Sequence, residues 1–334
     1  MGWLKKIGID GFVLSILLAV VVASVFPASE AFAPSLDKIV AIAIGLLFFL
    51  YGARLHPREA LDGLAHWRLH LLILSFTFVV FPLVGVAMRA LSPWLLSAPL
   101  YTGVLYLTLV PSTVQSSIAF TSIARGNVAG AIVSASASNL LGVFLTPLLV
   151  VVMVAVGLMG VDGDIQITGS AVVDIVVQLL LPFILGMLAR PLIGGWVKKN
   201  AAWLKYVDRI SILLVVYSAF SEGVREGIWG KVAVWQIVVL VVLSVLLVLF
   251  MLWLTRWSAQ RLGFSRADMI AIQFCGTKKS LASGLPMAAV LFSAGTVGLI
   301  VLPLMIFHQI QLMMCSWLAG RYAREPVADA PSPA

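Results

Sequence analysis

Two adjacent lysines, Lys278 and Lys279, lie inside a long apolar stretch near the C-terminal end of the sequence. Their surroundings, FCGTKKSLASGLPMA, also hold the helix-weakening residues Gly276, Gly284 and Pro286. An ammonium group in an apolar environment costs roughly 3 kcal/mol or more on membrane-insertion scales, so such lysines usually have a function. We therefore expect this stretch to form part of a binding site. Its polar residues are Thr277, Lys278, Lys279, Ser280 and Ser283.

A second polar stretch with a helix breaker occurs earlier, in VPSTVQSSIAFTS, where Pro111 interrupts an apolar segment. In lipid, the unpaired backbone groups of an interrupted helix survive only when they are buried in protein or line a cavity. Two interruptions that face each other would offer carbonyls, N–H groups and helix ends to an ion or a polar solute. Two ordinary proline kinks, with small residues for helix packing, are the alternative interpretation. The polar residues of this stretch are Ser112, Thr113, Gln115, Ser116 and Ser117.

The composition requires a membrane around most of the chain. Of the 334 residues, 61% are apolar and 11% are charged, whereas soluble proteins have roughly 45–50% and ~25%. A spanning helix takes ~20 residues, so we predict an all-α polytopic membrane protein with ten transmembrane helices. A signal peptide ending near Ala31-Phe32-Ala33 is the alternative for the first of them. The predicted segments are approximately 8–27, 36–55, 67–91, 99–124, 126–159, 166–190, 204–224, 232–257, 268–293 and 296–320.

The positive charges indicate an orientation rather than a nucleic-acid partner. The net charge is +8, but the 22 Lys and Arg residues are scattered between apolar runs and form no patch. Most of them fall in the loops on one side when the ten segments alternate across the membrane, and such loops are typically cytoplasmic. We therefore predict a cell (inner) membrane protein with both termini in the cytoplasm. Residues 321–334, which include three prolines, are expected to form a disordered cytoplasmic tail.

Ten segments divide into two groups of five, and an odd number of helices forces the second group to insert upside down. The first repeat would cover residues 1–159 and the inverted second repeat residues 160–320, within a single membrane domain, 1–334. The two polar interruptions then fall in the fourth helix of each repeat. Inverted repeats with interrupted helices at matching positions are typical of secondary transporters that work by alternating access.

At these motifs the chain resembles the bile acid:sodium symporters. Residues 111–147, PSTVQSSIAFTSIARGNVAGAIVSASASNLLGVFLTP, resemble the fourth and fifth helices of that family, and residues 276–285 resemble its broken ninth helix. The strings GTKKSLASGLPMA and LVPSTVQSS are most similar to the branch that includes solute carrier family 10 member 7. The resemblance implies a panel domain (helices 1, 2, 6 and 7) and a core domain (helices 3–5 and 8–10). It also implies that helices 4 and 9 cross where they unwind, and that the chain transports a small organic solute.

The sequence departs from the family at its sodium ligands. Sodium-using members carry a glutamate in the ninth helix, where this chain has Thr277, and two lysines follow it. The family's Ser-Asn pair corresponds to Ser116-Ser117, and its third-helix glutamine corresponds to Thr77. A hydroxyl ligand on the fifth helix corresponds to Ala135, although Ser134, Ser136, Ser138 and Asn139 are close by. The resemblance alone therefore does not imply that sodium is the coupling ion, and both sodium and the proton stay candidates.

Three roles for the lysines follow from their chemistry. An ammonium could stand in for the bound cation and couple transport to protons, because burial disfavours its charged form. The lysines could instead attract an anionic solute, such as a carboxylate or sulfonate, with help from helix N-termini. In the third role they only stabilise the core, by reaching an aqueous vestibule or a carboxylate. Adjacent residues need not share a role, because on a helix they point about 100° apart.

Other polar residues within the apolar segments are secondary candidates, with interhelical hydrogen bonding or packing as the alternative. Asn139, Thr77, Gln273 and His308, which lies beside Gln309 and Gln311, belong to this group. Asp174 is a candidate partner for a buried charge.

These features favour a secondary transporter whose partners are membrane lipids and a small organic, anionic solute. The sequence has no zinc-binding H-E-x-x-H, no G-x-S-x-G and no glycine-rich nucleotide loop, so we predict neither an enzyme nor a cofactor beyond a coupling sodium ion. A membrane regulator or scaffold that does not transport is the alternative, and solute or ion binding by the purified protein would discriminate against it. An intramembrane hydrolase built from a serine and Lys278 or Lys279 is the third interpretation.

Overall fold

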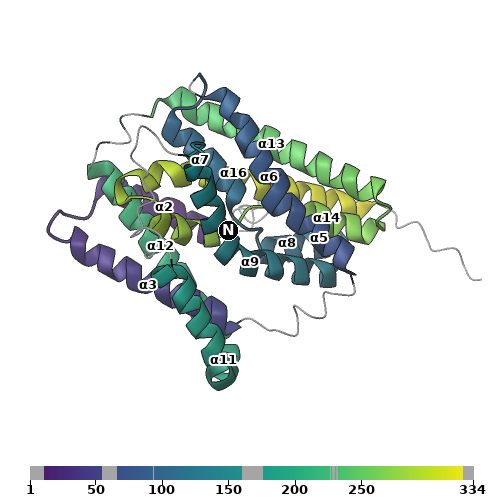
Figure 1. Cartoon of the computed structure of the whole chain (residues 1–334), viewed down its shortest axis with the longest axis horizontal. Helices are drawn as coiled ribbons and strands as arrows, with labels where there is room; N and C mark the ends of the chain where they lie inside the picture. The colour runs from purple at the N-terminus through teal and green to yellow at the C-terminus, as the bar shows by residue number, and fades with distance from the viewer. Residues whose placement is uncertain are drawn as a thin grey trace, which may run out of the picture.

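The computed structural model describes residues 11–54, 66–92, 94–159, 176–225, 227, 230 and 232–325, and these residues form helices and short connections without any strand (Figure 1). Long runs of Leu, Val, Ile and Ala favour this outcome, because a helix pairs its own backbone groups without water. The elements of the first half are α2 (Gly11–Val25), α3 (Ala33–Arg54), α5 (Trp67–Ser75), η2 (Phe76–Val80), α6 (Phe81–Ala87), η3 (Met88–Leu91), α7 (Ala98–Leu109), α8 (Gln115–Ile123) and α9 (Val128–Ala155). Those of the second half are η4 (Val176–Leu180), α11 (Leu181–Lys199), α12 (Ala201–Arg225), α13 (Val234–Arg261), α14 (Arg266–Thr277), α15 (Leu281–Leu291) and α16 (Ala294–Arg324).

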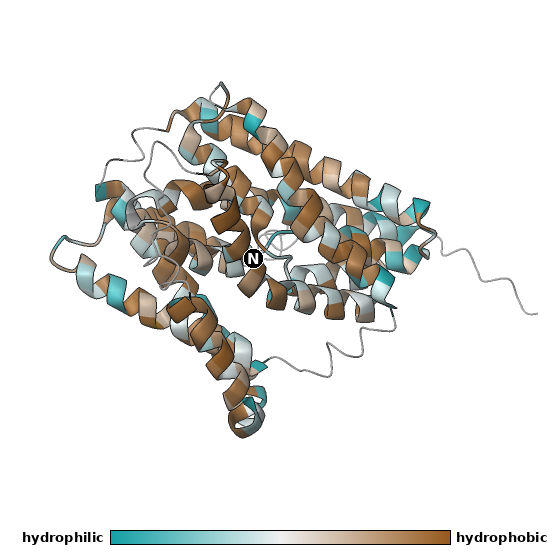
Figure 2. Cartoon of the chain, viewed as in Figure 1, coloured by the Kyte–Doolittle hydropathy of each residue, from teal (hydrophilic) through white to brown (hydrophobic). Residues whose placement is uncertain are grey.

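Within the residues that the structure describes, six stretches of helix are long and apolar enough to cross a membrane. They are Ala33–Arg54, Trp67–Leu91, Val128–Ala155, Val176–Lys199, Val234–Arg261 and Gly295–Arg324. Large apolar side chains such as Leu83, Leu192 and Trp253 are exposed on the outer surface, and Figure 2 shows hydrophobic colour along the outside of α13. A helix that is apolar on all sides is typical of a membrane span. The prediction of an all-helical membrane protein is therefore confirmed.

The two predicted interruptions are confirmed as well. The fourth apolar segment is split into α7 and α8 by residues 110–114, and the ninth is split into α14 and α15 by residues 278–280. Several predicted ends are wrong. The helix of the sixth segment continues to Lys199, and α16 continues to Arg324, because their last turns carry basic residues suited to helix C-termini. Residues 321–324 of the predicted tail are therefore helical, whereas residues 326–334 and Asp174 lie outside the described residues.

Four helices form a group at one edge of the molecule, where α3 packs against α11 and α2 packs against α12 (Figure 1). The α3–α11 contact is close because each helix presents a glycine to the other. A methyl group on Gly52 would overlap the carbonyl of Phe183, and one on Gly186 would overlap the carbonyl of Phe49. Small residues that let helix backbones touch are typical of membrane helix pairs.

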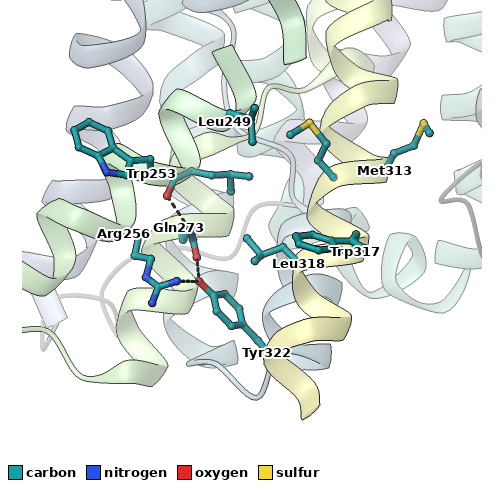
Figure 3. Close-up of a pocket in the computed structure, with 10 residues that line it drawn as sticks. Leu249, Trp253, Arg256, Gln273, Met313, Trp317, Leu318 and Tyr322 are labelled. Carbon is teal, nitrogen blue, oxygen red and sulfur yellow. Dashed lines mark hydrogen bonds between the residues drawn. The ribbon is translucent and has the colours of Figure 1, made fainter. Parts of the chain in front are cut away.

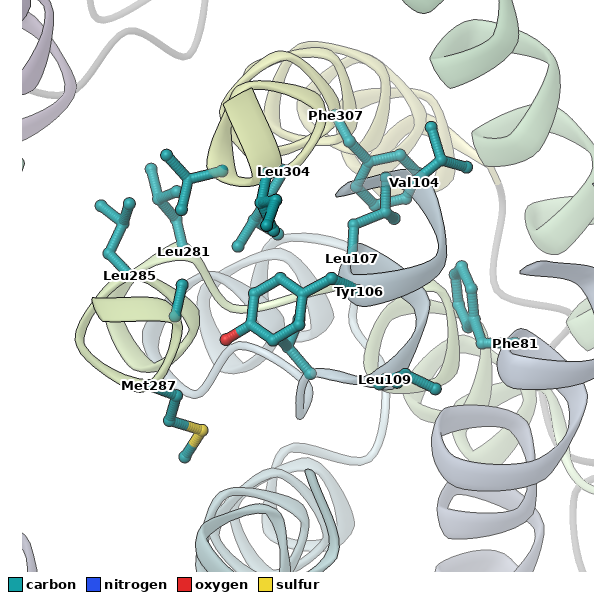
Figure 4. Packing of buried hydrophobic residues seen from close by; sticks show 14 of the residues in the cluster. Phe81, Val104, Tyr106, Leu107, Leu109, Leu281, Leu285, Met287, Leu304 and Phe307 are labelled. Atoms are coloured by element: carbon teal, nitrogen blue, oxygen red, sulfur yellow. The ribbon is translucent and has the colours of Figure 1, made fainter. Parts of the chain in front are cut away.

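The remaining helices pack around the two interruptions. Phe81 of α6, Tyr106 of α7, Met287 of α15 and Phe307 of α16 are buried in one hydrophobic cluster. Figure 4 shows the Tyr106 ring between these helices, with its hydroxyl directed toward α15. That hydroxyl donates a hydrogen bond to the carbonyl of Gly284 at 2.7 Å. The apolar cluster therefore encloses the interrupted backbone and excludes water from most of it.

We expect Gly186→Ala to lower the free energy of unfolding by about 1–3 kcal/mol, as overpacking usually does. The added methyl would meet backbone, which cannot swing aside as a side chain can. Gly195→Ala on the same helix is the matched control, because nothing lies within 4 Å of its added methyl. Alanine favours helix over glycine by up to about 1 kcal/mol, so this control should be neutral or stabilising. Thermal unfolding in detergent measures both, and equal effects would contradict the close α3–α11 contact.

Candidate functional site

The two interruptions meet in the buried core and are joined backbone to backbone. The N–H of Ser280, the residue before α15, donates to the carbonyl of Pro111 at 2.8 Å. Helix α7 ends before Pro111 because proline has no N–H for the carbonyl four residues earlier. Pro111 lies against α9 at Gly142, where a methyl group would come within 2.6 Å of the proline ring. Pro111 thus lies between α9 and the residue before α15.

The last two carbonyls of α7, and the one that follows them, have partners outside the helix. Thr146 of α9 donates its hydroxyl to the carbonyl of Leu109 at 2.9 Å. The helical partner of the Thr108 carbonyl would be the N–H of Ser112, which instead donates to the hydroxyl of Ser138. The carbonyls of Thr108 and Val110 are therefore left for a donor from outside the helix.

Lys279 supplies that donor. Its Nζ donates to the carbonyls of Thr108 at 2.7 Å, Val110 at 2.9 Å and Thr77 at 2.9 Å. The side chain is fully buried, and its Nζ lies 4.3 Å from the centre of the Phe81 ring. An ammonium has three N–H donors, so this one is saturated. We name the carbonyls of Thr77, Thr108 and Val110 the carbonyl cage.

The third carbonyl of the cage comes from a π-helical turn. In η2 the N–H of Phe81 donates to the carbonyl of Phe76, five residues back. In that register the Thr77 carbonyl would need the N–H of residue 82, which is Pro82 and has none. The Thr77 hydroxyl turns back to the carbonyl of Ile73 at 2.9 Å. Thr77 therefore contributes its backbone carbonyl to the cage, and not its side chain, as the resemblance to the family implied.

The backbone of Lys279 is held by Gln311 of α16. The Gln311 side-chain oxygen accepts from the Lys279 N–H at 2.8 Å, and its amide nitrogen donates to the Lys279 carbonyl at 2.7 Å. His308 Nδ1 lies 3.3 Å from the same carbonyl. Of the neighbours His308, Gln309 and Gln311, only His308 is a predicted site residue, and Gln311 is a site residue that the sequence prediction lacks. The cluster of polar residues in an apolar helix was the signal that could have identified it.

Lys278 has a different environment. Its Nζ donates to the carbonyl of Ser116 at 2.7 Å and lies 3.8 Å and 5.4 Å from the ring centres of Phe120 and Phe274. The side chain is fully buried. Cation–π contact supplements its single carbonyl partner. The two ammonium groups therefore differ in the number of carbonyls that hold them.

Hydroxyl groups complete the crossing. Ser112 donates its hydroxyl to the carbonyl of Cys275 at 2.6 Å, and Ser117 donates to that of Phe274 at 3.4 Å. Ser283 donates to the side-chain oxygen of Asn139 at 2.7 Å. The structure thus places together the predicted residues Ser112, Thr113, Ser116, Ser117, Asn139, Lys278, Lys279, Ser280 and Ser283, with Thr77 and His308 beside Lys279.

Three predicted residues point elsewhere. Gln115, the first residue of α8, is exposed. Thr277 faces Thr255 of α13, with 3.4 Å between their hydroxyl oxygens. Gln273, one turn earlier, also faces α13. Its side chain donates to the carbonyl of Leu252 and accepts from the Tyr322 hydroxyl. It lines a cavity of about 520 Å³ between α13, α14 and α16 (Figure 3). Gln273 therefore lies apart from the crossing.

Neither ammonium has a carboxylate beside it within the described part of the chain. The ion pairs found there join Arg54 to Asp208, Arg225 to Glu222 and Arg266 to Glu325, all away from the crossing. The same residues contain no cluster of His, Cys, Asp and Glu that could hold a metal. Two positive charges in the core are therefore stabilised by carbonyls and aromatic rings.

Comparison with known proteins bears out the resemblance noted from the motifs. A family model described as the SBF-like CPA transporter family matches residues 10–324. A relative in Escherichia coli (strain K12), named Putative symporter YfeH, is 50% identical over 317 residues, which cover 95% of this chain and 94% of that protein. Pseudomonas aeruginosa protein PA2026 is 50% identical over 330 residues and 97% of each chain. Sodium/bile acid cotransporter 7-B of Xenopus laevis is 28% identical over 324 residues, which cover 95% of this chain and 93% of that protein.

We expect Gln311→Leu to lower the free energy of unfolding by about 2 kcal/mol or more, because it leaves the N–H and carbonyl of Lys279 buried without their amide partner. Gln309→Leu is the matched control on the same helix. The buried amide atoms of Gln309 make no hydrogen bond within the described residues, so leucine there should be neutral or stabilising. Thermal unfolding of the two variants in detergent separates these outcomes. A Gln311→Leu variant as stable as the parent would show that the amide clamp does not hold the crossing.

Proposed function

The chain belongs to the SBF-like CPA transporter family, and from this membership we propose that it is a secondary active transporter that moves a small organic anion across the membrane by alternating access. Two of these relatives are named as a putative symporter and a cotransporter, which fits a multi-pass membrane carrier of a small solute rather than an enzyme. The observation that carries the proposal is the buried crossing of two interrupted helices, with two ammonium groups at it. Such crossings are where secondary transporters bind their solutes and ions.

The proposal includes ten membrane spans in two inverted repeats. The four spans beyond the six long ones would be α2, α12, and the interrupted pairs α7–α8 and α14–α15. The packing supports the repeats, because α2 packs against α12 as α3 does against α11, and α6 packs against α7 as α13 does against α14. The excess of Lys and Arg on one side supports cytoplasmic termini in the cell (inner) membrane.

Alternating access would move two groups of helices against each other. The panel consists of α2, α3, α11 and α12, and the core consists of the helices around the crossing. The ion pair between Arg54 of α3 and Asp208 of α12 lies within the panel, so it supports movement of the panel as a unit. The panel meets the core mainly where α12 packs on α15 and α16. That surface would be the one that slides or rocks during transport.

The charge at the crossing supports an anionic solute. Two ammonium groups that have no carboxylate beside them among the described residues favour a negative charge nearby, because charges act strongly in the apolar core. Helices α8 and α15 both begin at the crossing, and helix N-termini carry partial positive charge. Exposed Gln115 and half-buried Ser116 offer a polar edge at the start of α8. A carboxylate or sulfonate would suit this site.

A cation gradient would drive the transport, since several relatives are named as sodium cotransporters. Sodium and the proton are the two candidate coupling ions, and Thr277 in place of the family's glutamate favours the proton. Ligand-induced thermal stabilisation measured in sodium, potassium and choline salts separates them. A requirement for sodium would assign that ion, whereas equal shifts in all three salts would exclude it.

We expect an organic anion to raise the thermal stability of the purified protein, and Lys278→Met to weaken its binding at least ten-fold, or about 1.4 kcal/mol. Methionine keeps the length of the side chain but removes the charge. Lys205→Met is the control, because exposed Lys205 of α12 loses the same charge away from the crossing. A thermal-shift screen of small carboxylates, sulfonates and steroid conjugates finds the ligand, and uptake into proteoliposomes then tests transport. Equal stabilisation by neutral analogues, or equal losses in both variants, would contradict an anion site at Lys278.

A further inference from the structure

The carbonyl cage has the form of a binding site for a small monovalent cation. Three carbonyl oxygens, one from the π-helical turn η2 and two from the C-terminal end of α7, converge on one nitrogen at 2.7, 2.9 and 2.9 Å. The Phe81 ring lies 4.3 Å from the same nitrogen. Backbone carbonyls that replace a hydration shell are the usual ligands of monovalent cations inside membrane proteins. Here the position of the cation is taken by the Lys279 ammonium.

The cage is built by residues other than Lys279. The Thr77 carbonyl is free because η2 is π-helical and Pro82 lacks an N–H. The Thr108 carbonyl is free because the Ser112 N–H donates to Ser138. Both Thr108 and Val110 lie at the C-terminal end of α7, where the helix dipole is negative. None of these features depends on the lysine side chain, so the cage should persist without it.

Among the described residues, the neighbouring lysine has no such cage. The Lys278 Nζ has one carbonyl partner, that of Ser116, and otherwise faces aromatic rings. One oxygen is too few to replace the hydration shell of a metal cation. Lys278 is therefore a matched comparison: an adjacent, equally buried ammonium whose removal leaves no cation site.

We propose that Lys279 is a built-in cation: its ammonium permanently fills a monovalent-cation site, and removing the side chain turns the carbonyl cage into a site for a free cation. The inference concerns the cation site alone, and it rests on the proposed function only for its consequence in transport. That consequence is that the crossing stays assembled without any cation from solution at this cage. A coupling sodium ion, if the carrier used one, would have to bind elsewhere.

Chemical rescue of Lys279→Ala tests the proposal. The substitution removes three methylenes and the ammonium, which together correspond to propylammonium. The full-length variant is purified in detergent, and its thermal unfolding is followed at equal ionic strength in chlorides of sodium, potassium, propylammonium and tetramethylammonium. We expect a midpoint well below that of the parent in tetramethylammonium, which has no N–H donor and is too large for the cage. Propylammonium, and potassium or sodium, should recover at least half of the loss.

Two comparisons make the result specific. The parent should show equal midpoints in sodium, potassium and tetramethylammonium, because its cage is filled. Lys278→Ala should gain nothing from sodium or potassium over tetramethylammonium, since it leaves a single carbonyl. Lys279→Met, whose apolar chain still occupies the cage, should be destabilised and not recovered by any of the cations.

Several outcomes would overturn the proposal. One is a Lys279→Ala variant that is folded but equally stable in all four salts. Another is sodium-selective stabilisation of the parent as large as that of the variant. Lys279→Ala could be folded only in some of the salts. In that case the yield of monodisperse protein should be several-fold higher in propylammonium than in tetramethylammonium. Equal yields in the two salts, or no folded protein in either, would count against a cage that accepts free cations. Anion binding by the parent is measured separately, so the failure of the transporter proposal would be visible on its own.

Discussion

The constraint on which the structure depends is the pairing of backbone groups where two helices are interrupted inside an apolar core. Buried groups without partners would cost several kcal/mol each. Carbonyls and N–H groups at the breaks are therefore paired across the crossing: Ser280 with Pro111, Ser112 with Cys275, and Gln311 with both backbone groups of Lys279. The same pairing that satisfies the backbone also fixes the angle and depth at which α7–α8 and α14–α15 meet.

This constraint also explains why lysines are tolerated at the crossing. A buried ammonium needs three acceptors, and an interrupted helix end offers carbonyls that need donors. At Lys279 the two needs match, because Thr77, Thr108 and Val110 supply the three acceptors. At Lys278 they match only in part, with one carbonyl and two rings. Removing a lysine donor without a replacement would therefore leave these carbonyls unpaired, at the cost that the lysine now offsets.

Much of the fold could be predicted from the sequence, because the apolar runs and the breakers Pro111, Gly276 and Pro286 are visible in it. The partners of each site residue could not, because they depend on backbone groups that carry no sequence signal. Thr77 binds the Lys279 ammonium through a backbone carbonyl that a π-helical turn leaves unpaired, and no pattern of side chains predicts that turn. Gln273 and Thr277 both face α13, as their spacing of four residues allows, but only the packing shows which neighbour that face meets.

A cation that is part of a side chain and a free cation differ in what they can do in a carrier, which must both stabilise its crossing and bind a solute. A free ion stabilises a site only in proportion to its concentration, so the site loosens whenever the ion is scarce. A tethered ammonium keeps the cage paired at any salt concentration, but its charge cannot travel with a solute. Under the proposed function, the positive charge that binds the anionic solute must then come from a group with fewer hydrogen-bond partners than Lys279. Lys278, with one carbonyl partner beside the half-buried Ser116, is the ammonium with that freedom. The adjacent lysines would thus separate the structural cation from the one that meets the anion.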